Sequence, residues 1–78
     1  MAQQVEIIEE IAKYLGVTPQ DIDLSASLSE DLGINTIELA DLLSALSVKF
    51  NITFNPEETE RLSTVNDIVV MIEDLSLE

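Results

Sequence analysis

The clearest structural signals lie in residues 28–50, which read LSEDLGINTIELADLLSALSVKF. Asn35 is a favourable helix N-cap, and Glu38 three residues later can complete a capping box. Gly33 and Ile34 precede them as candidates for a turn and a hydrophobic staple. Apolar residues then recur at helical spacing, at Ile37, Leu39, Leu42, Leu43, Leu46 and Phe50. The stretch predicts a turn followed by a helix over 36–50, which ends at Asn51 or at Asn55-Pro56.

A first helix is predicted from Gln4 to about Leu15, because Gly16 is a typical residue just after a helix and Pro19 prevents easy continuation. Its expected apolar stripe comprises Val5, Ile8, Ile11, Ala12 and Leu15. Ile7 and Tyr14 fall outside this stripe, and the pattern leaves open whether they widen the core or face solvent.

The connection over residues 17–35 has no sustained helical period. Thr18 and Pro19 predict one short helical turn. Regularly spaced apolar residues are expected to anchor the rest of this long loop to the core, namely Val17, Ile22, Leu24, Leu28 and Leu32.

Two further helices follow. Asn55 and Pro56 open a short helix that hardly extends beyond Leu62. Ser63 or Thr64 caps the last helix, whose stripe is Val65, Ile68, Val69, Ile72 and Leu75. We therefore expect an all-α, four-helix bundle with three longer helices, one short helix and a long first loop. A single domain over residues 1–78 is expected, since a second would need about 100 further residues.

The charge balance restricts the function. Sixteen acidic and three basic residues give a net charge of −13, and the chain contains neither Cys nor His. Most self-contained catalytic sites are thereby excluded, and we expect no enzyme. Repulsion disfavours nucleic acid and anionic membranes, and partners with basic surfaces are favoured.

The sequence gives no sign of membrane targeting or of a metal site. Its N-terminus lacks the features of a signal peptide, and its longest apolar run, Ile68–Ile72, is too short to span a bilayer. We expect a cytoplasmic monomer without membrane insertion. A calcium loop starting at Asp21 is rejected, because Ala26 stands where Gly is required and Leu32 where Glu is required.

Thr36 places a hydroxyl at the first position of the predicted second helix. Unpaired N–H groups and a partial positive charge at a helix N-terminus stabilise a phosphate attached there. From the residues alone, the simpler explanation, that Thr36 is a secondary capping residue, is favoured.

The stretch from Leu28 to Leu46 resembles the signature of acyl carrier proteins, (D/E)-x-G-x-D-S-(L/I) followed by an acidic amphipathic helix. The resemblance covers roughly residues 5–75. The matching attachment motif is Asp31, Leu32, Gly33, Asn35, Thr36 and Ile37. It implies a covalent 4′-phosphopantetheine arm on Thr36, whose thiol holds acyl chains as thioesters for fatty acid, polyketide or related synthesis. The implied partners are a phosphopantetheinyl transferase and acyl-processing enzymes with basic surfaces.

The resemblance also assigns roles to surface and core residues. Partner recognition falls on Glu38, Asp41, Ser44, Val48, Glu57 and Glu60. The implied acyl pocket, which is also the expected core, comprises Leu39, Leu42, Leu43, Leu46, Phe54, Leu62, Ile68 and Ile72.

Two departures from the family pattern leave a second interpretation open. Asn35-Thr36 stands where the family has Asp-Ser, and Ser44, Ser47 and Val48 stand where it usually has an apolar and two acidic contacts. The chain is therefore either a carrier with a variant attachment site or an unmodified carrier fold that acts as a binding or regulatory module. An acidic mimic of nucleic acid rests on charge alone and ranks last.

Overall fold

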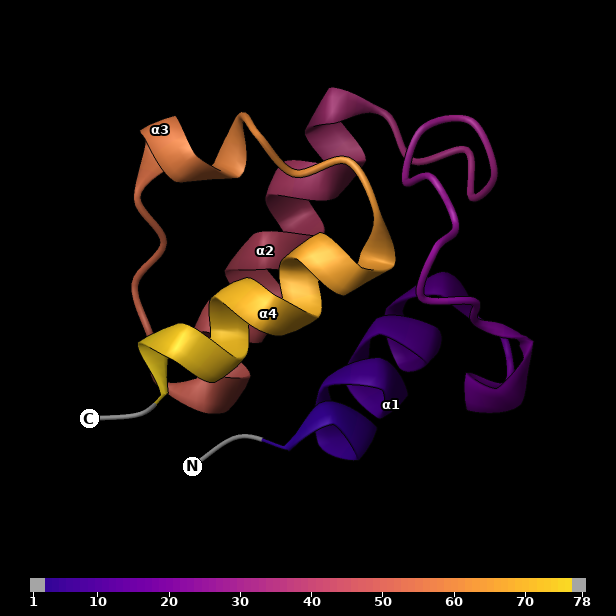
Figure 1. Cartoon of the computed structure of the whole chain (residues 1–78), viewed down its shortest axis with the longest axis horizontal. Coiled ribbons are helices and arrows are strands. Elements are labelled where there is room, and N and C mark those ends of the chain that lie inside the picture. The colour runs from indigo at the N-terminus through magenta and orange to yellow at the C-terminus, as the bar shows by residue number, and fades with distance from the viewer. Residues whose placement is uncertain (1–2, 77–78) are drawn as a thin grey trace.

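The computed structural model describes residues 3–76 and shows four α-helices and one 3₁₀ turn (Figure 1). The elements are α1 (Gln4–Leu15), a 3₁₀ turn (Pro19–Asp21), α2 (Thr36–Phe50), α3 (Pro56–Thr59) and α4 (Val65–Leu75). The predicted all-α bundle, with three longer helices, one short helix and a long first loop, is confirmed.

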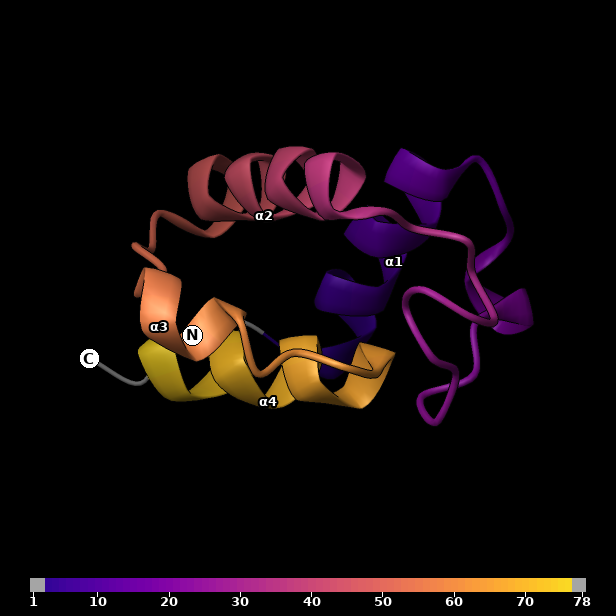
Figure 2. The same ribbon diagram turned by 90° about the horizontal axis from the view of Figure 1, so that it is seen from above.

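The three longer helices surround one core. In Figure 2, α2 and α4 lie on opposite sides of the molecule, and α1 lies between them. Helix α1 contacts both of the others. The short α3 lies at one end, and the long loop between α1 and α2 forms the other end. The start of α2 is therefore held between this loop and the segment that joins α3 to α4.

The buried core confirms most of the expected apolar stripes. Fully buried side chains come from all three long helices, and Leu28 and Ile34 add two contacts from the loop. The cluster comprises Ile7, Ile11, Leu28, Ile34, Leu42, Leu43, Leu46, Val65, Ile68, Val69 and Ile72.

Three apolar positions differ from the prediction. Val5 is 66% exposed and Ile7 is fully buried, so the stripe of α1 runs through Ile7 instead of Val5. Residues two apart on a helix point about 200° away from each other, so only one of this pair can face the core. Ile37 is 76% exposed for the same reason, since it precedes the partly buried Leu39 by two residues. Val17 is exposed and does not anchor the loop.

The long loop is fastened to the start of α4 by backbone hydrogen bonds. The amide of Leu28 donates to the carbonyl oxygen of Ser63 at 2.9 Å, and that of Val65 donates to Ala26 at 3.2 Å. Asn66 donates to the carbonyl oxygen of Leu24 at 2.9 Å. These bonds give the loop a fixed path although it contains little regular structure.

Asp67 makes the start of α4 sensitive to acid. The backbone N–H groups of Thr64 and Ser63 donate to its carboxylate and hold the pKa of Asp67 below its usual value of 3.8. A carboxyl whose pKa is lower in the folded state stabilises the fold above its unfolded pKa, and this contribution is lost as pH falls through the folded pKa.

We expect Asp67→Asn to lower the melting temperature most near pH 7, and the difference from the parent protein to shrink below about pH 4. Thermal unfolding followed by circular dichroism measures this difference. Asp74→Asn removes one charge from the same helix and serves as the control. A difference that stays constant with pH would show that the negative charge of Asp67 does not contribute to stability.

Candidate functional site

The turn before α2 is built around Ser27 and Asp31. The Asp31 carboxylate accepts a hydrogen bond from the Ser27 amide at 2.7 Å, and the Ser27 carbonyl accepts from the amides of Asp31 and Leu32. Gly33 then adopts a φ of +68°, a conformation that side-chain-bearing residues rarely adopt. The motif residues Asp31, Leu32 and Gly33 thus direct the chain into α2.

Asn35 and Glu38 form the predicted capping box. The Glu38 amide donates to Asn35 Oδ1 at 2.7 Å, and the Asn35 amide donates to Glu38 Oε1 at 3.1 Å. Two of the amides at the helix start are thereby paired. The capping role of Asn35 needs only its side-chain oxygen, which Asn and Asp share.

Thr36 is the first residue of α2, and its side chain is exposed. Within residues 3–76, its hydroxyl forms no hydrogen bond, and the amides of Thr36 and Ile37 donate none. The helix N-terminus therefore keeps two free N–H donors beside an accessible hydroxyl. A phosphodiester on Thr36 Oγ1 fits this surrounding, because free donors and the helix dipole both stabilise an anion.

Tyr14 links the end of α1 to this site. Its hydroxyl donates to the carbonyl oxygen of Glu38 at 3.2 Å. Partial burial raises the pKa of Tyr14, and the negative charges of Asp41 and Glu38 raise it further. The neutral, donating form of the phenol is therefore favoured at the first turn of α2.

Two adjoining surface hollows lie beside Thr36, and we call them together the attachment groove. Their volumes are about 420 and 250 Å³, and both are lined by Thr36, Leu39 and Leu62. The larger one runs between α2 and α3, and its other lining residues are Ala40, Leu43, Thr59 and Glu60. Thr36 thus borders both hollows, of which the larger is mainly apolar and the smaller more polar.

The expected acyl-pocket residues divide between this groove and the core. Leu39, Leu43 and Leu62 line the groove. Leu42, Leu46, Ile68 and Ile72 are buried in the central cluster. Phe54 is partly buried and lines a neighbouring hollow of about 370 Å³, which also contains Ser44 and Val48.

The expected partner-recognition residues are all exposed. Glu38 and Asp41 lie in the first half of α2, and Ser44 and Val48 follow on the same helix. Glu57 belongs to α3, and Glu60 lies just after it and borders the attachment groove. Of the acidic residues among them, Glu60 alone lines the groove, and the second half of α2 is uncharged up to Lys49.

Sequence reasoning missed three residues that shape this site. Ser27 accepts the hydrogen bonds that form the turn, and Ala40 and Thr59 line the attachment groove. Ala40 follows Thr36 by four residues on one helix, a spacing that signals a shared face. Thr59 has no such signal, because its position depends on how α3 lies against α2.

The described residues offer neither a membrane-spanning helix nor a cluster of metal ligands. In the part of the chain that is described, no helix has the length and apolar character needed to cross a bilayer. The same residues contain no group of three or more acidic side chains placed to hold a metal ion.

Together, these features define a small acidic helical bundle that presents one free hydroxyl at the start of its second long helix. Residues 5–72 match the model of a family described as a phosphopantetheine attachment site. The acyl carrier protein of Wolinella succinogenes is 37% identical over 68 residues, which cover 87% of this chain and 90% of the relative. That of Exiguobacterium sibiricum is 39% identical over 69 residues, covering 88% and 87%.

A third relative, the acyl carrier protein of Campylobacter concisus, is 32% identical over 75 residues, or 96% of this chain and 97% of the relative. The chain belongs to the acyl carrier protein family. Members of this family are carriers that interact with acyl-processing enzymes and are not enzymes themselves, as expected for this chain. The family also supports a covalently attached 4′-phosphopantetheine as the cofactor.

Proposed function

We propose that this protein carries acyl intermediates on a 4′-phosphopantetheine arm attached to Thr36 Oγ1. The arm, when bound, supplies a thiol that forms thioesters with acyl groups. Fatty acid synthesis, polyketide synthesis and related pathways in the cytoplasm are the proposed settings. The observation that carries the proposal is the free, exposed Thr36 hydroxyl at the start of α2, within the segment that matches the attachment-site family.

In the attachment step, Thr36 Oγ1 forms a bond to a phosphorus of coenzyme A. The pyrophosphate bond of coenzyme A breaks, and the nucleotide part leaves with the bonding electron pair. A transferase removes the hydroxyl proton, because this chain has no His to serve as the general base. The free amides of Thr36 and Ile37 are placed to stabilise the resulting phosphodiester.

The attachment groove supports the same proposal. Its apolar walls, Leu39, Leu43 and Leu62, begin next to Thr36 and could cover part of a hydrocarbon chain. Each buried methylene group contributes about 0.8 kcal/mol, so a groove of this volume would favour a carried acyl chain over an exposed one.

The direct test is the intact mass of the protein recovered from its native host. We expect a mass increase equal to one phosphopantetheine, with or without an acyl group. Fragmentation should locate the increase on Thr36. A modification found on Ser29 or Thr64, or none at all, would contradict the proposal.

Asn35-Thr36 in place of the family's Asp-Ser favours one alternative function. An unmodified carrier fold would act as a binding or regulatory module, with Ser44, Ser47 and Val48 as its own contact surface. A native mass equal to that of the bare chain, together with failure of transfer in vitro, would favour this function over the first.

We further propose that Glu38, Asp41, Glu57 and Glu60 contact basic residues of the transferase and of acyl-processing enzymes. Reversing the charge of Glu38 and Asp41 together should slow association with a phosphopantetheinyl transferase about tenfold or more and weaken its dependence on salt. Stopped-flow binding at several ionic strengths measures both effects.

The matched control is Glu6→Lys with Glu9→Lys on α1. Its two acids have the same spacing, and Glu6 is also the capping-box acid of its helix. Equal slowing by the two double variants would show that only the total charge matters. Unchanged binding by the α2 variant would move the interface to Ser44 and Val48.

A further inference from the structure

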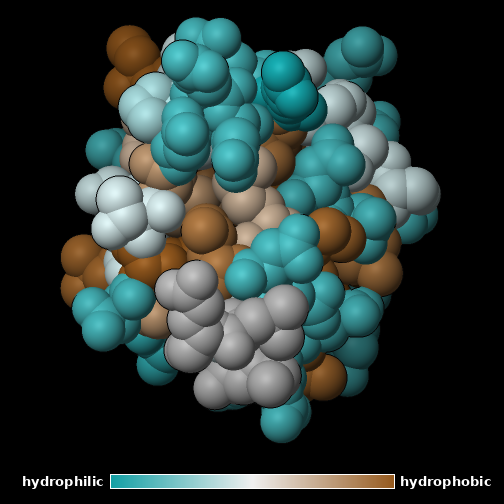
Figure 3. All heavy atoms as spheres, turned by 60° about the vertical axis from the view of Figure 1, so that its left-hand side comes forward, coloured by the Kyte–Doolittle hydropathy of each residue, from teal (hydrophilic) through white to brown (hydrophobic). Residues whose placement is uncertain are grey.

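A second groove lies between α3 and α4, away from Thr36, and we call it the α3–α4 groove. Its volume is about 500 Å³, and its apolar lining consists of Leu62, Val70, Met71 and Leu75. Val70 is 45% exposed. On the face of the molecule seen in Figure 3, apolar side chains gather between hydrophilic ones.

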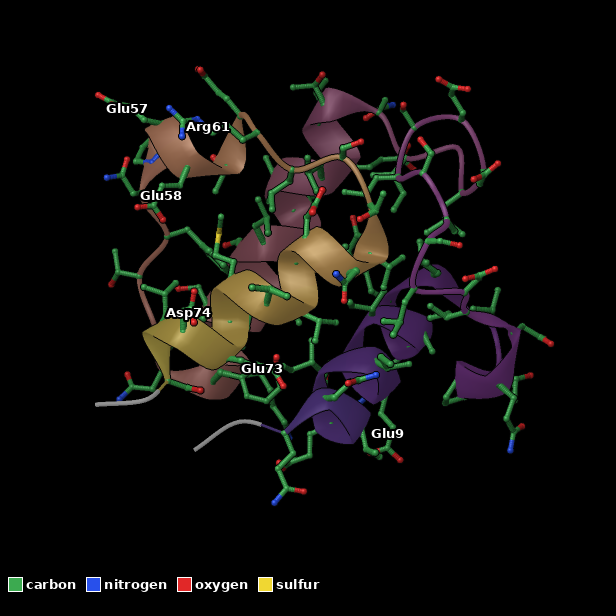
Figure 4. All side chains as sticks on the ribbon, viewed as in Figure 1. Glu9, Glu57, Glu58, Arg61, Glu73 and Asp74 are labelled. Atoms are coloured by element: carbon green, nitrogen blue, oxygen red, sulfur yellow. The ribbon has the colours of Figure 1, made fainter. Side chains whose placement is uncertain are left out.

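Charged side chains border this groove. Glu58 and Arg61 come from α3 and the segment after it, and Asp67 and Asp74 come from α4. Figure 4 shows Glu58 and Arg61 on one side and Asp74 on the other. Within residues 3–76, the one ion pair joins Lys49 to Glu10, so none of these four groups has an ionic partner in the described chain.

The charges indicate what kind of molecule this groove accepts. A second copy of the chain is disfavoured, because two bodies that each carry a charge of −13 repel each other. A partner segment with basic residues beside an apolar side chain matches this groove, whose apolar lining is bordered by the carboxylates of Glu58, Asp67 and Asp74. Arg61 repels basic groups at the α3 end, so the basic residues belong beside Asp67 and Asp74.

We propose that the α3–α4 groove is a docking site for a basic amphipathic segment of a partner protein. An apolar side chain of that segment lies on Val70 and Met71, and its Lys or Arg residues pair with Asp74 and Asp67. The proposal does not depend on modification of Thr36. Leu62 lines both this groove and the attachment groove, so the two sites share one side chain.

The test uses the full chain and a synthetic amphipathic helix composed only of leucine and lysine. Nitrogen–proton NMR titration should place the largest shift changes at Leu62, Val70, Met71 and Leu75. Val70→Asp should weaken binding about tenfold, because it removes an apolar contact from the groove. The added negative charge would strengthen a purely electrostatic association, so weaker binding reports the apolar contact.

Val17→Asp is the matched control, since it makes the same change at a valine that is also 45% exposed and lies outside the groove. It should leave the affinity within about twofold of the parent, below the tenfold loss expected at Val70. A peptide with serine in place of leucine should bind more weakly at the same charge. The proposal is overturned if the shifts map to α2, if Val17→Asp weakens binding as much, or if the serine peptide binds equally well. Unchanged circular dichroism would show that both variants remain folded.

Discussion

Replacing Thr36 by Ser and Asn35 by Asp in one chain is expected to raise the rate of phosphopantetheine transfer by about 10- to 200-fold. In a closely fitting transferase site, one surplus carbon such as the Thr36 methyl costs about 1–3 kcal/mol. Aspartate at position 35 would keep the capping bond to the Glu38 amide, now 2.7 Å long, and make it charge-assisted. Transfer from coenzyme A by a general transferase, followed by intact mass, measures the rate.

Two single variants and one variant without the hydroxyl complete this experiment. Thr36→Ser isolates the methyl group, and Asn35→Asp isolates the charge; their effects need not add, because the residues are adjacent. Thr36→Ala should accept no group. If the double variant remains unmodified, the departures at Ser44, Ser47 and Val48 block recognition, and the unmodified module becomes the better function.

Leu46→Ala is expected to lower the free energy of unfolding by about 2–5 kcal/mol. Leu46 is 1% exposed and belongs to the central cluster between α2 and its neighbours. Removing its branched end leaves a cavity in addition to the lost burial of apolar surface. Since small domains are stabilised by only about 5–15 kcal/mol, such a loss should unfold a measurable share of the protein at moderate temperature.

Urea unfolding followed by circular dichroism measures the change in free energy. Val48→Ala, on the same helix but 82% exposed, provides the control and should change stability by less than about 0.5 kcal/mol. Similar losses for the two variants would mean that the burial of Leu46 does not determine the effect, since Ala has the higher helix propensity in both cases.

The helix boundaries were predictable because they depend on nearby residues. Asn35, Asn55 and Thr64 accept bonds from amides two or three positions ahead, so their capping role is visible in the sequence. The motif around Thr36 could be predicted for the same reason, since turn, cap and hydroxyl lie within a few residues.

Features that depend on distant contacts could not be predicted. Val5 and Ile7 are both good core residues in sequence, and only the position of α1 between α2 and α4 selects Ile7. The attachment groove and the α3–α4 groove require α3 to lie near both α2 and α4, which no local pattern encodes. Thr59 acquires its place only through this packing.

The bonds between residues 24–28 and 63–66 have a consequence for the order of events during protein synthesis. The turn that leads into Thr36 lies in the first half of the chain, but its backbone is paired with residues translated much later. Contacts so distant in sequence form late, because closing a long loop costs entropy first. A nascent chain therefore presents Thr36 in an incomplete surrounding until α4 docks, and a transferase that requires the finished turn would select molecules that have completed folding.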